Sequence, residues 1–223
     1  MKNYFFTLLL LFSITMNAQN KPQLIYVGDA MCSWCYGFAP EITKVKAHFE
    51  NTLDFKLING GLRPYNTDSI VSLAYFLEMH WKEVSRKSGQ KFNYEILKNT
   101  DFIYDTEPAS RAVVVCRNLK PEKEFEFFKA TQDLFYFQNK ETNKAESYKT
   151  LVEDFGIDYS TFENQFNSAE LKQQTKKDFE AAASIGVSGF PSVILFHNNK
   201  YVVISNGYSK AETIISTIQN QLK

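Results

Sequence analysis

The chain has 223 residues, of which 44% are hydrophobic and 22% are charged, as in ordinary folded domains and unlike disordered or fibrous chains. Lysine and arginine together number 25, as do aspartate and glutamate, so the formal net charge is zero. This balance argues against a general nucleic-acid binder, and three cysteines are too few for the disulfide framework of a small secreted scaffold. The length predicts one or two compact domains.

The N-terminal segment has the pattern of a secretory signal peptide. Lys2 gives a positive start, residues 4–14 form a mostly apolar run that is too short to span a bilayer, and Ala18 is a small residue suited to cleavage. A buried N-terminal helix or an uncleaved anchor is the less favoured alternative. We therefore expect residues 1–18 to be a signal peptide and the mature protein to be periplasmic or secreted, without a membrane span. Outside the cytosol its thiols can rest as disulfides.

The hydropathy pattern then predicts strands on both sides of a helical block. Residues 23–28 and 54–59 are expected strands around a helix over 32–49 that contains Pro40, which makes a βαβ unit. A second unit is expected near the C-terminus, with strands at 192–196 and 201–204, a hairpin turn at 197–200 and a last helix over 209–222 capped by Ser209. Between the two units, helices are expected at 69–87, 108–119, 121–138, 148–155, 159–167 and 169–183.

This pattern predicts an α/β protein in two parts. Residues 19–65 and 186–223 would form one discontinuous domain, because each half is too small to fold alone. Residues 66–185 would form an inserted, all-helical domain.

The chemistry concentrates in Cys32-Ser33-Trp34-Cys35, at the expected junction of the first strand and the first helix. A helix that begins at Cys32 directs unpaired N–H groups and the positive end of its dipole at that sulfur, which favours thiolate over thiol. The spacing places the second sulfur within bonding distance. Cys32 is therefore the candidate nucleophile, and Cys35 is the candidate thiol that resolves a mixed disulfide.

Other interpretations of the pair are weaker. Zinc would need two further ligands, and the remaining candidates lack the spacing of a metal finger: Cys116, His48, His80 and His197. Haem attachment needs a histidine directly after the second cysteine, where Tyr36 stands. A purely structural disulfide stays possible, and Cys116, in an apolar segment, is expected to be a buried small hydrophobe. No metal and no organic cofactor are expected.

A second feature is the segment Gly189-Phe190-Pro191, which directly precedes an expected strand. Local sequence alone favours an ordinary trans proline. A cis bond before Pro191 would instead leave the backbone of Phe190 free to pair with a substrate strand.

Together the cysteine pair, Pro40 and the Gly-Phe-Pro segment before a final ββα unit resemble the thioredoxin superfamily, and the long helical insertion resembles its DsbA-type branch. Residues 29–38 and 106–112 are similar to bacterial DsbA-like proteins described as predicted disulfide isomerases. That group also resembles kappa-class glutathione transferases and 2-hydroxychromene-2-carboxylate isomerases. The resemblance implies a thioredoxin fold (βαβ…ββα) with inserted helices, in which Cys32 is the nucleophile, Cys35 the resolving thiol and Pro191 a cis-proline facing them.

The chain departs from the pattern in three ways. Tyr26 stands where many relatives have a buried acid, so Asp29, a water or another group would have to transfer the proton of Cys35. Ser33 and Trp34 differ from the dipeptides of strong oxidases and of reducing thioredoxins, which predicts a reduction potential between about −120 and about −270 mV. No N-terminal dimerisation domain of the kind that dimeric isomerases carry is expected before the cysteine motif, which weakens the interpretation as an isomerase of that kind. A monomer is the favoured oligomeric state.

We therefore expect an exported thiol-disulfide oxidoreductase, acting as an oxidase or isomerase on cysteine-containing client proteins together with an unknown redox partner. Tyr36, Gly189 and Phe190 are the candidate substrate-binding residues. One alternative is a glutathione-dependent isomerase or transferase acting on a small molecule. Another is a chaperone-like module that binds clients and holds only a structural disulfide.

Overall fold

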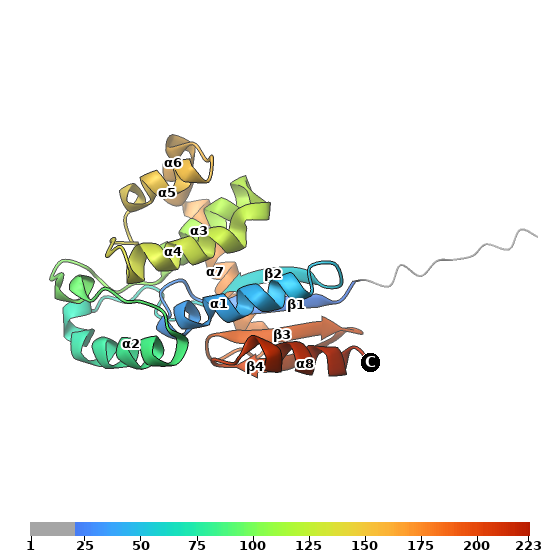
Figure 1. Cartoon of the computed structure of the whole chain (residues 1–223). Coiled ribbons are helices and arrows are strands. Elements are labelled where there is room, and N and C mark those ends of the chain that lie inside the picture. The colour runs from blue at the N-terminus through green and yellow to red at the C-terminus, as the bar shows by residue number, and fades with distance from the viewer. Residues whose placement is uncertain (1–20) are drawn as a thin grey trace, which may run out of the picture.

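Four strands form one mixed sheet in the order β2-β1-β3-β4. β1 (Gln23–Gly28) pairs in parallel with β2 (Asp54–Asn59), whereas β3 (Ser192–His197) runs antiparallel to both β1 and β4 (Lys200–Asn206). The computed structural model describes residues 21–223, so the expected signal peptide at 1–18 lies outside the described residues. The two units expected from the sequence thus complete a single sheet, which confirms the α/β class (Figure 1).

Helices belong either to the strand units or to the segment between β2 and β3. The first group is α1 (Ser33–His48) and α8 (Ala211–Gln221). The longer helices of the second group are α2 (Ala74–Ser88), α3 (Glu107–Leu119), α4 (Glu124–Tyr136), α5 (Lys149–Asp154), α6 (Tyr159–Phe166) and α7 (Ala169–Ser184). Short 3₁₀ helices lie among them: η1 (Ile70–Leu73), η2 (Glu95–Lys98), η3 (Pro121–Lys123) and η4 (Ala145–Tyr148).

Alternate residues of the strands face two different hydrophobic clusters. On one side Leu24 and Tyr26 of β1 join a large core that contains residues of α1, α4 and α8. On the other side Ile25 and Val27 pack with Ala182 of α7. Because successive side chains of a strand point to opposite faces, the sheet is buried on both sides between these helices (Figure 1).

The hairpin between β3 and β4 follows from two asparagines. Asn198 and Asn199 have φ angles of 50° and 58°, the left-handed values required at both central positions of a tight hairpin turn. His197 pairs directly with Lys200 across this turn. The hairpin expected at residues 197–200 is thus confirmed.

The start of the last helix differs from the sequence expectation. α8 begins at Ala211, and Ser209 does not cap it. Instead the carboxylate of Glu41, in α1, accepts a hydrogen bond from the backbone N–H of Ala211 at 2.9 Å, and it also lies 3.3 Å from Nζ of Lys210. A cap supplied from another helix is invisible to local sequence patterns. These contacts lower the pKa of Glu41, although its burial opposes the shift.

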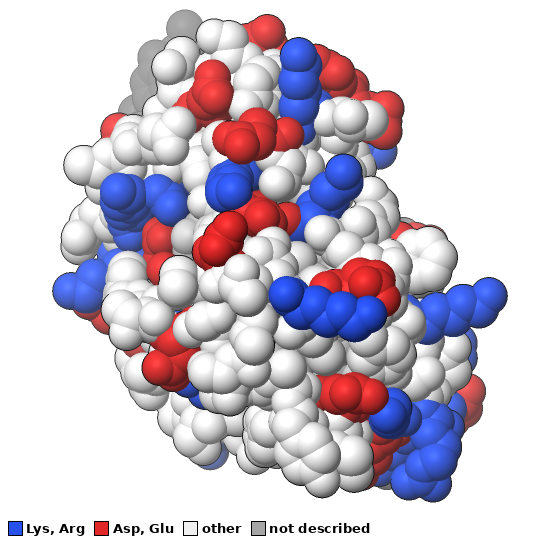
Figure 2. Space-filling model, turned by 90° about the vertical axis from the view of Figure 1, so that its left-hand side faces the viewer, with Lys and Arg blue, Asp and Glu red and all other residues white. Residues whose placement is uncertain are grey.

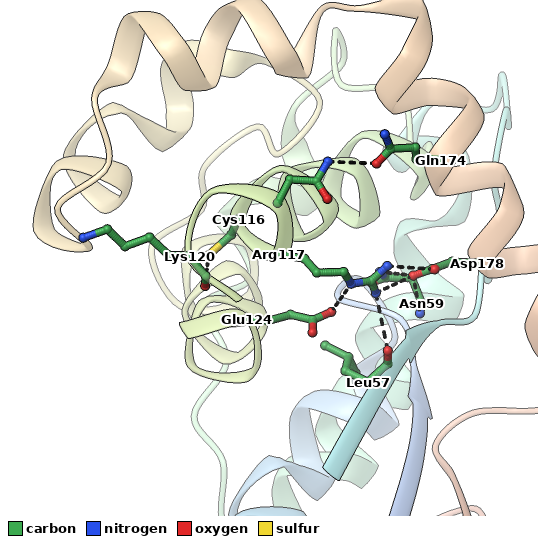
Figure 3. Close-up of polar contacts among 9 residues, drawn as sticks. Leu57, Asn59, Cys116, Arg117, Lys120, Glu124, Gln174 and Asp178 are labelled. Carbon is green, nitrogen blue, oxygen red and sulfur yellow. Dashed lines mark hydrogen bonds and ion pairs between the residues drawn. The ribbon is translucent and has the colours of Figure 1, made fainter. Parts of the chain in front are cut away.

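A charged cluster joins the helical segment to the sheet (Figure 3). The guanidinium of Arg117, in α3, contacts Glu124 of α4 at 2.6 Å and both carboxylate oxygens of Asp178 of α7 at 2.7 and 2.9 Å. Asp178 in turn accepts hydrogen bonds from the backbone N–H and the side-chain amide of Asn59, the last residue of β2. Three helices are therefore fixed to the end of β2, directly before Gly60 and the candidate site.

Candidate active site

The cysteine motif lies where β1 passes into α1. Cys32 is the N-cap residue of α1, with an extended backbone at φ −90° and ψ 116°, and its own N–H donates to the carbonyl oxygen of Asp29 at 3.1 Å. The first turn of the helix contains no acidic residue. Its unpaired N–H groups and positive dipole end therefore lie beside the Cys32 sulfur, with no carboxylate in the same turn.

The two cysteines differ in exposure. Cys32 keeps 5% of its surface accessible, whereas Cys35, in the first turn of α1, keeps none. Burial raises the pKa of Cys35 well above its ordinary value, and the nearby Cys32 raises it further. Cys32 is thus the sulfur that a substrate can reach, and Cys35 is a protonated thiol held behind it.

The segment before β3 faces Cys32. The Phe190–Pro191 bond is cis, and the Cys32 thiol points to the carbonyl oxygen of Phe190 with a separation of 3.8 Å. The Phe190 ring packs against Gly60, where an added Cβ would lie only 2.1 Å from the ring. Glycine at position 60 is therefore required for this close approach. Gly189 is half-buried beside Phe190, and its carbonyl accepts a hydrogen bond from Ser192 at 2.8 Å.

Asp29 is completely buried between the cysteine motif and the loop after β2. One carboxylate oxygen accepts the N–H of Met31 at 2.8 Å, and the other accepts the N–H of Leu62 at 2.7 Å. Burial raises the pKa of Asp29 to about 6, although these hydrogen bonds oppose the shift. A carboxyl group with this pKa can exchange protons near neutral pH.

The remaining candidates divide between the surface and the core. Ser33 and Trp34 are partly exposed, and the Trp34 ring lies beside Tyr208 and beneath Nζ of Lys87, at 6.1 and 5.5 Å. The Tyr36 ring is instead stacked on a tyrosine of α4, and its hydroxyl lies 3.0 Å from a backbone carbonyl. Tyr36 therefore contacts the core and not the surface in front of Cys32.

Two supporting residues were not expected from the sequence. The hydroxyl of Tyr104 donates to the carbonyl oxygen of Met31 at 2.7 Å and so supports the turn before Cys32. Gly60, which directly follows the expected strand at 54–59, accommodates Phe190. The Gly60-Gly61 pair is the sequence feature that could have indicated a close approach, whereas nothing near Tyr104 points to the cysteines.

Cys116 lies outside this site and packs among the helices. It is buried in α3, and burial raises the pKa of its thiol to about 12. Within residues 21–223, no group of three His, Cys, Asp or Glu side chains converges as metal ligands. No helix in that range is long and apolar enough to cross a membrane.

The dithiol lies at the start of the first helix and faces a cis X–Pro bond that precedes an antiparallel strand, and helices are inserted between the two strand units. Together these features define a DsbA-like protein with a thioredoxin fold. The thioredoxin family model matches residues 25–212, and the chain belongs to this family. No curated protein matches the sequence.

Solved structures agree with this assignment. A candidate protein disulfide isomerase from Nitrosomonas europaea is 36% identical with a TM-score of 0.82, over 91% of this chain and 98% of that one. The cytosolic disulfide reductase DsbM from Pseudomonas aeruginosa is 21% identical with a TM-score of 0.75, over 90% and 98%. A DsbA oxidoreductase candidate from Streptomyces coelicolor is 15% identical with a TM-score of 0.71, over 90% of each chain. The last two support the fold alone.

The buried carboxyl of Asp29 predicts a specific dependence of stability on pH. Because its pKa is about 6 in the folded protein and 3.8 ordinarily, ionising it costs more in the folded state than in the unfolded chain. Its contribution to the free energy of unfolding therefore falls by about 3 kcal/mol in total as the pH rises from about 3 to about 7. Denaturant unfolding across this pH range should show that Asp29→Asn removes this decrease. Parallel curves for the variant and the wild type would contradict it.

Proposed function

We propose that this protein is a thiol-disulfide oxidoreductase that exchanges disulfides with cysteine-containing proteins through Cys32 and Cys35. The observation that carries the proposal is the Cys32 sulfur at a helix N-terminus, 3.8 Å from the carbonyl oxygen of Phe190, with a buried protonated thiol behind it. The N. europaea relative, described as a candidate protein disulfide isomerase, agrees with this chemistry.

In the reducing direction, the Cys32 thiolate attacks a client disulfide and forms a mixed disulfide, while the other client sulfur leaves as a thiolate. Cys35 then gives its proton to the Asp29 carboxylate, attacks the Cys32 sulfur and releases the second client thiolate. The client disulfide is reduced by two electrons as the Cys32–Cys35 disulfide forms. The same steps in reverse oxidise a client dithiol, and an isomerase uses both directions.

The backbone of Phe190 supports the choice of a polypeptide substrate. Pro191 has no N–H, and Phe190 lies just outside β3, so its backbone groups can pair with an extended segment beside Cys32. We further propose that residues 1–18 direct export, so that the reaction takes place outside the cytosol.

The reduction potential tests the proposal. The mature protein would be equilibrated in glutathione buffers, with fluorescence of Trp34 as the readout. We expect a value between about −120 and about −270 mV. A potential near the upper limit would indicate an oxidase, and one near the lower limit a reductant. A disulfide that glutathione cannot reduce would contradict the proposal and favour a structural bond in a client-binding module.

An exposed apolar band favours protein clients over glutathione. Within residues 62–79 six large hydrophobic side chains are exposed: Leu62, Tyr65, Val71, Tyr75, Phe76 and Met79. The band begins next to the site, since the N–H of Leu62 is bonded to Asp29. Figure 2 shows this side of the molecule, where uncharged surface extends between scattered charges. Such a surface suits an unfolded polypeptide better than a small charged tripeptide.

This preference can be measured with surface variants. We expect the combined substitutions Tyr75→Ser, Phe76→Ser and Met79→Ser to raise the KM for a reduced, unfolded protein about tenfold, because each lost apolar contact is worth about 1 kcal/mol or less. The reaction with glutathione should be unchanged. Tyr201→Ser with Val203→Ser, exposed on β4, is the matched control. Equal effects of both sets of substitutions would exclude the apolar band as the client surface.

A further inference from the structure

Tyr26 is held beneath the cysteine pair with its hydroxyl in a fixed place. The residue is completely buried, and its ring is surrounded by Phe38, Phe125 and Phe128 at centroid distances of 5.8 to 6.3 Å. The hydroxyl passes over Gly28, where an added Cβ would lie 2.7 Å from the oxygen. The glycine thus leaves room for the hydroxyl at the end of β1 that leads into the cysteine motif.

This hydroxyl is a buried donor without an oxygen or nitrogen partner among residues 21–223. A buried hydroxyl that makes no hydrogen bond costs the protein free energy. The neighbouring polar groups are Cys35, Cys32 and Asp29, and a negative charge on any of them raises the pKa of Tyr26 further beyond the effect of its burial. The phenol therefore keeps its proton at every physiological pH, so it can donate a hydrogen bond but cannot act as a base.

We propose that the Tyr26 hydroxyl donates a hydrogen bond to the Cys35 sulfur whenever that sulfur carries negative charge, and so accelerates the step that resolves the mixed disulfide. The inference rests on the proposed function. A neutral thiol is a weak acceptor, whereas a thiolate is a strong one, so the hydroxyl gains its partner only as the reaction proceeds. An interaction that strengthens toward the transition state increases the rate of that step.

The step balances without any further reactant. Cys35 transfers its proton to Asp29, and its thiolate attacks the Cys32 sulfur of the mixed disulfide. The Cys32–Cys35 bond forms as the bond from Cys32 to the client sulfur breaks, and the client leaves as a thiolate. In the oxidising direction Cys35 is the leaving thiolate, and the same hydrogen bond stabilises its departure.

The test follows the two chemical steps separately. The reduced protein is mixed with an aromatic disulfide that releases a coloured thiolate. The first equivalent of colour reports the attack by Cys32, and the second reports resolution by Cys35. In Tyr26→Phe we expect the rate of the second phase to fall about tenfold relative to the first. The pH at which the rate of the second phase increases should also shift upward.

The groups that titrate around Cys35 are Cys32 and Asp29, while Tyr104 and Tyr136 face the same cluster with raised pKa values.

Tyr148→Phe is the matched control. Tyr148 is equally buried, but its hydroxyl donates to the carbonyl oxygen of Thr142 at 2.8 Å, and no cysteine influences its pKa. An unchanged second phase in Tyr26→Phe, or an equal slowing in Tyr148→Phe, would overturn the inference. If Tyr26→Phe fails to fold, Gly28→Ala decides, because the added Cβ displaces the hydroxyl without removing it. Wild-type protein that releases no second equivalent would instead refute the proposed function, and the inference with it.

Discussion

Cys35→Ser should accumulate as a covalent complex with its clients, whereas Cys32→Ser should form none. The accessible edge of Cys32 can still attack a client disulfide in the first variant, but a serine hydroxyl at position 35 cannot displace the client sulfur. In the second variant the only remaining sulfur of the pair is fully buried and protonated. We expect Cys32→Ser to reduce disulfide exchange by at least about a hundredfold.

Non-reducing electrophoresis after acid quenching measures both results, and adding a reductant should release the trapped clients. Cys116→Ser is the control, because that thiol is buried in α3 with a pKa of about 12 and should take no part in exchange. Trapping that persists in Cys32→Ser, or that disappears in Cys116→Ser, would contradict the assignment of the nucleophile.

The second large effect is expected at the start of α3, where Arg111 and Glu107 form a buried ion pair. Their side chains are only 7% and 5% exposed, with 3.2 Å between the charged atoms. Arg111 also donates to the carbonyl oxygen of Phe166 at 2.8 Å. Removing one partner leaves a buried charge without compensation, so we expect Arg111→Ala to lower the free energy of unfolding by about 3 to 5 kcal/mol. Denaturant unfolding at neutral pH gives the value.

The double variant Glu107→Leu with Arg111→Met separates the pair's net contribution from the cost of an unpaired charge. Since apolar residues of similar volume often replace a buried pair at little cost, we expect the double variant to be more stable than Arg111→Ala. Lys98→Ala breaks a pair that is mostly exposed and should change stability by less than about 1 kcal/mol. If Arg111→Ala lowers the free energy of unfolding no more than Lys98→Ala does, the expected cost of leaving a buried charge unpaired is contradicted.

Features encoded in a few neighbouring residues were predictable from the sequence. The cysteine motif at the strand-to-helix junction and the turn at Asn198-Asn199 follow from local spacing and residue type, and both are confirmed. The cis bond before Pro191 was expected only from the resemblance, because local sequence alone favours trans. Local patterns therefore gave the position of the cysteine pair, and the resemblance supplied the segment that faces it.

Features that join distant segments were not predictable in the same way. Glu41 caps α8 across more than half of the chain, so Ser209 was a reasonable but wrong choice. The spacing of Glu107 and Arg111, four residues apart in a helix, suits an ion pair, but its burial depends on how α6 packs over α3. Asp29 was one of several candidates for proton transfer, and only the fold shows that its carboxylate is buried with both oxygens bonded.

The position of β1 between β2 and β3 has a consequence for the order in which the protein can assemble. Tyr26 pairs with Leu57 on one side and with Val193 on the other, so the strand that leads into the cysteine motif acquires its second neighbour only after the segment around Val193 has been synthesised. Pairing over such a sequence separation is intrinsically slow. A nascent chain therefore exposes its dithiol before Phe190 is in place, and the candidate active site is complete only once β3 has paired with β1.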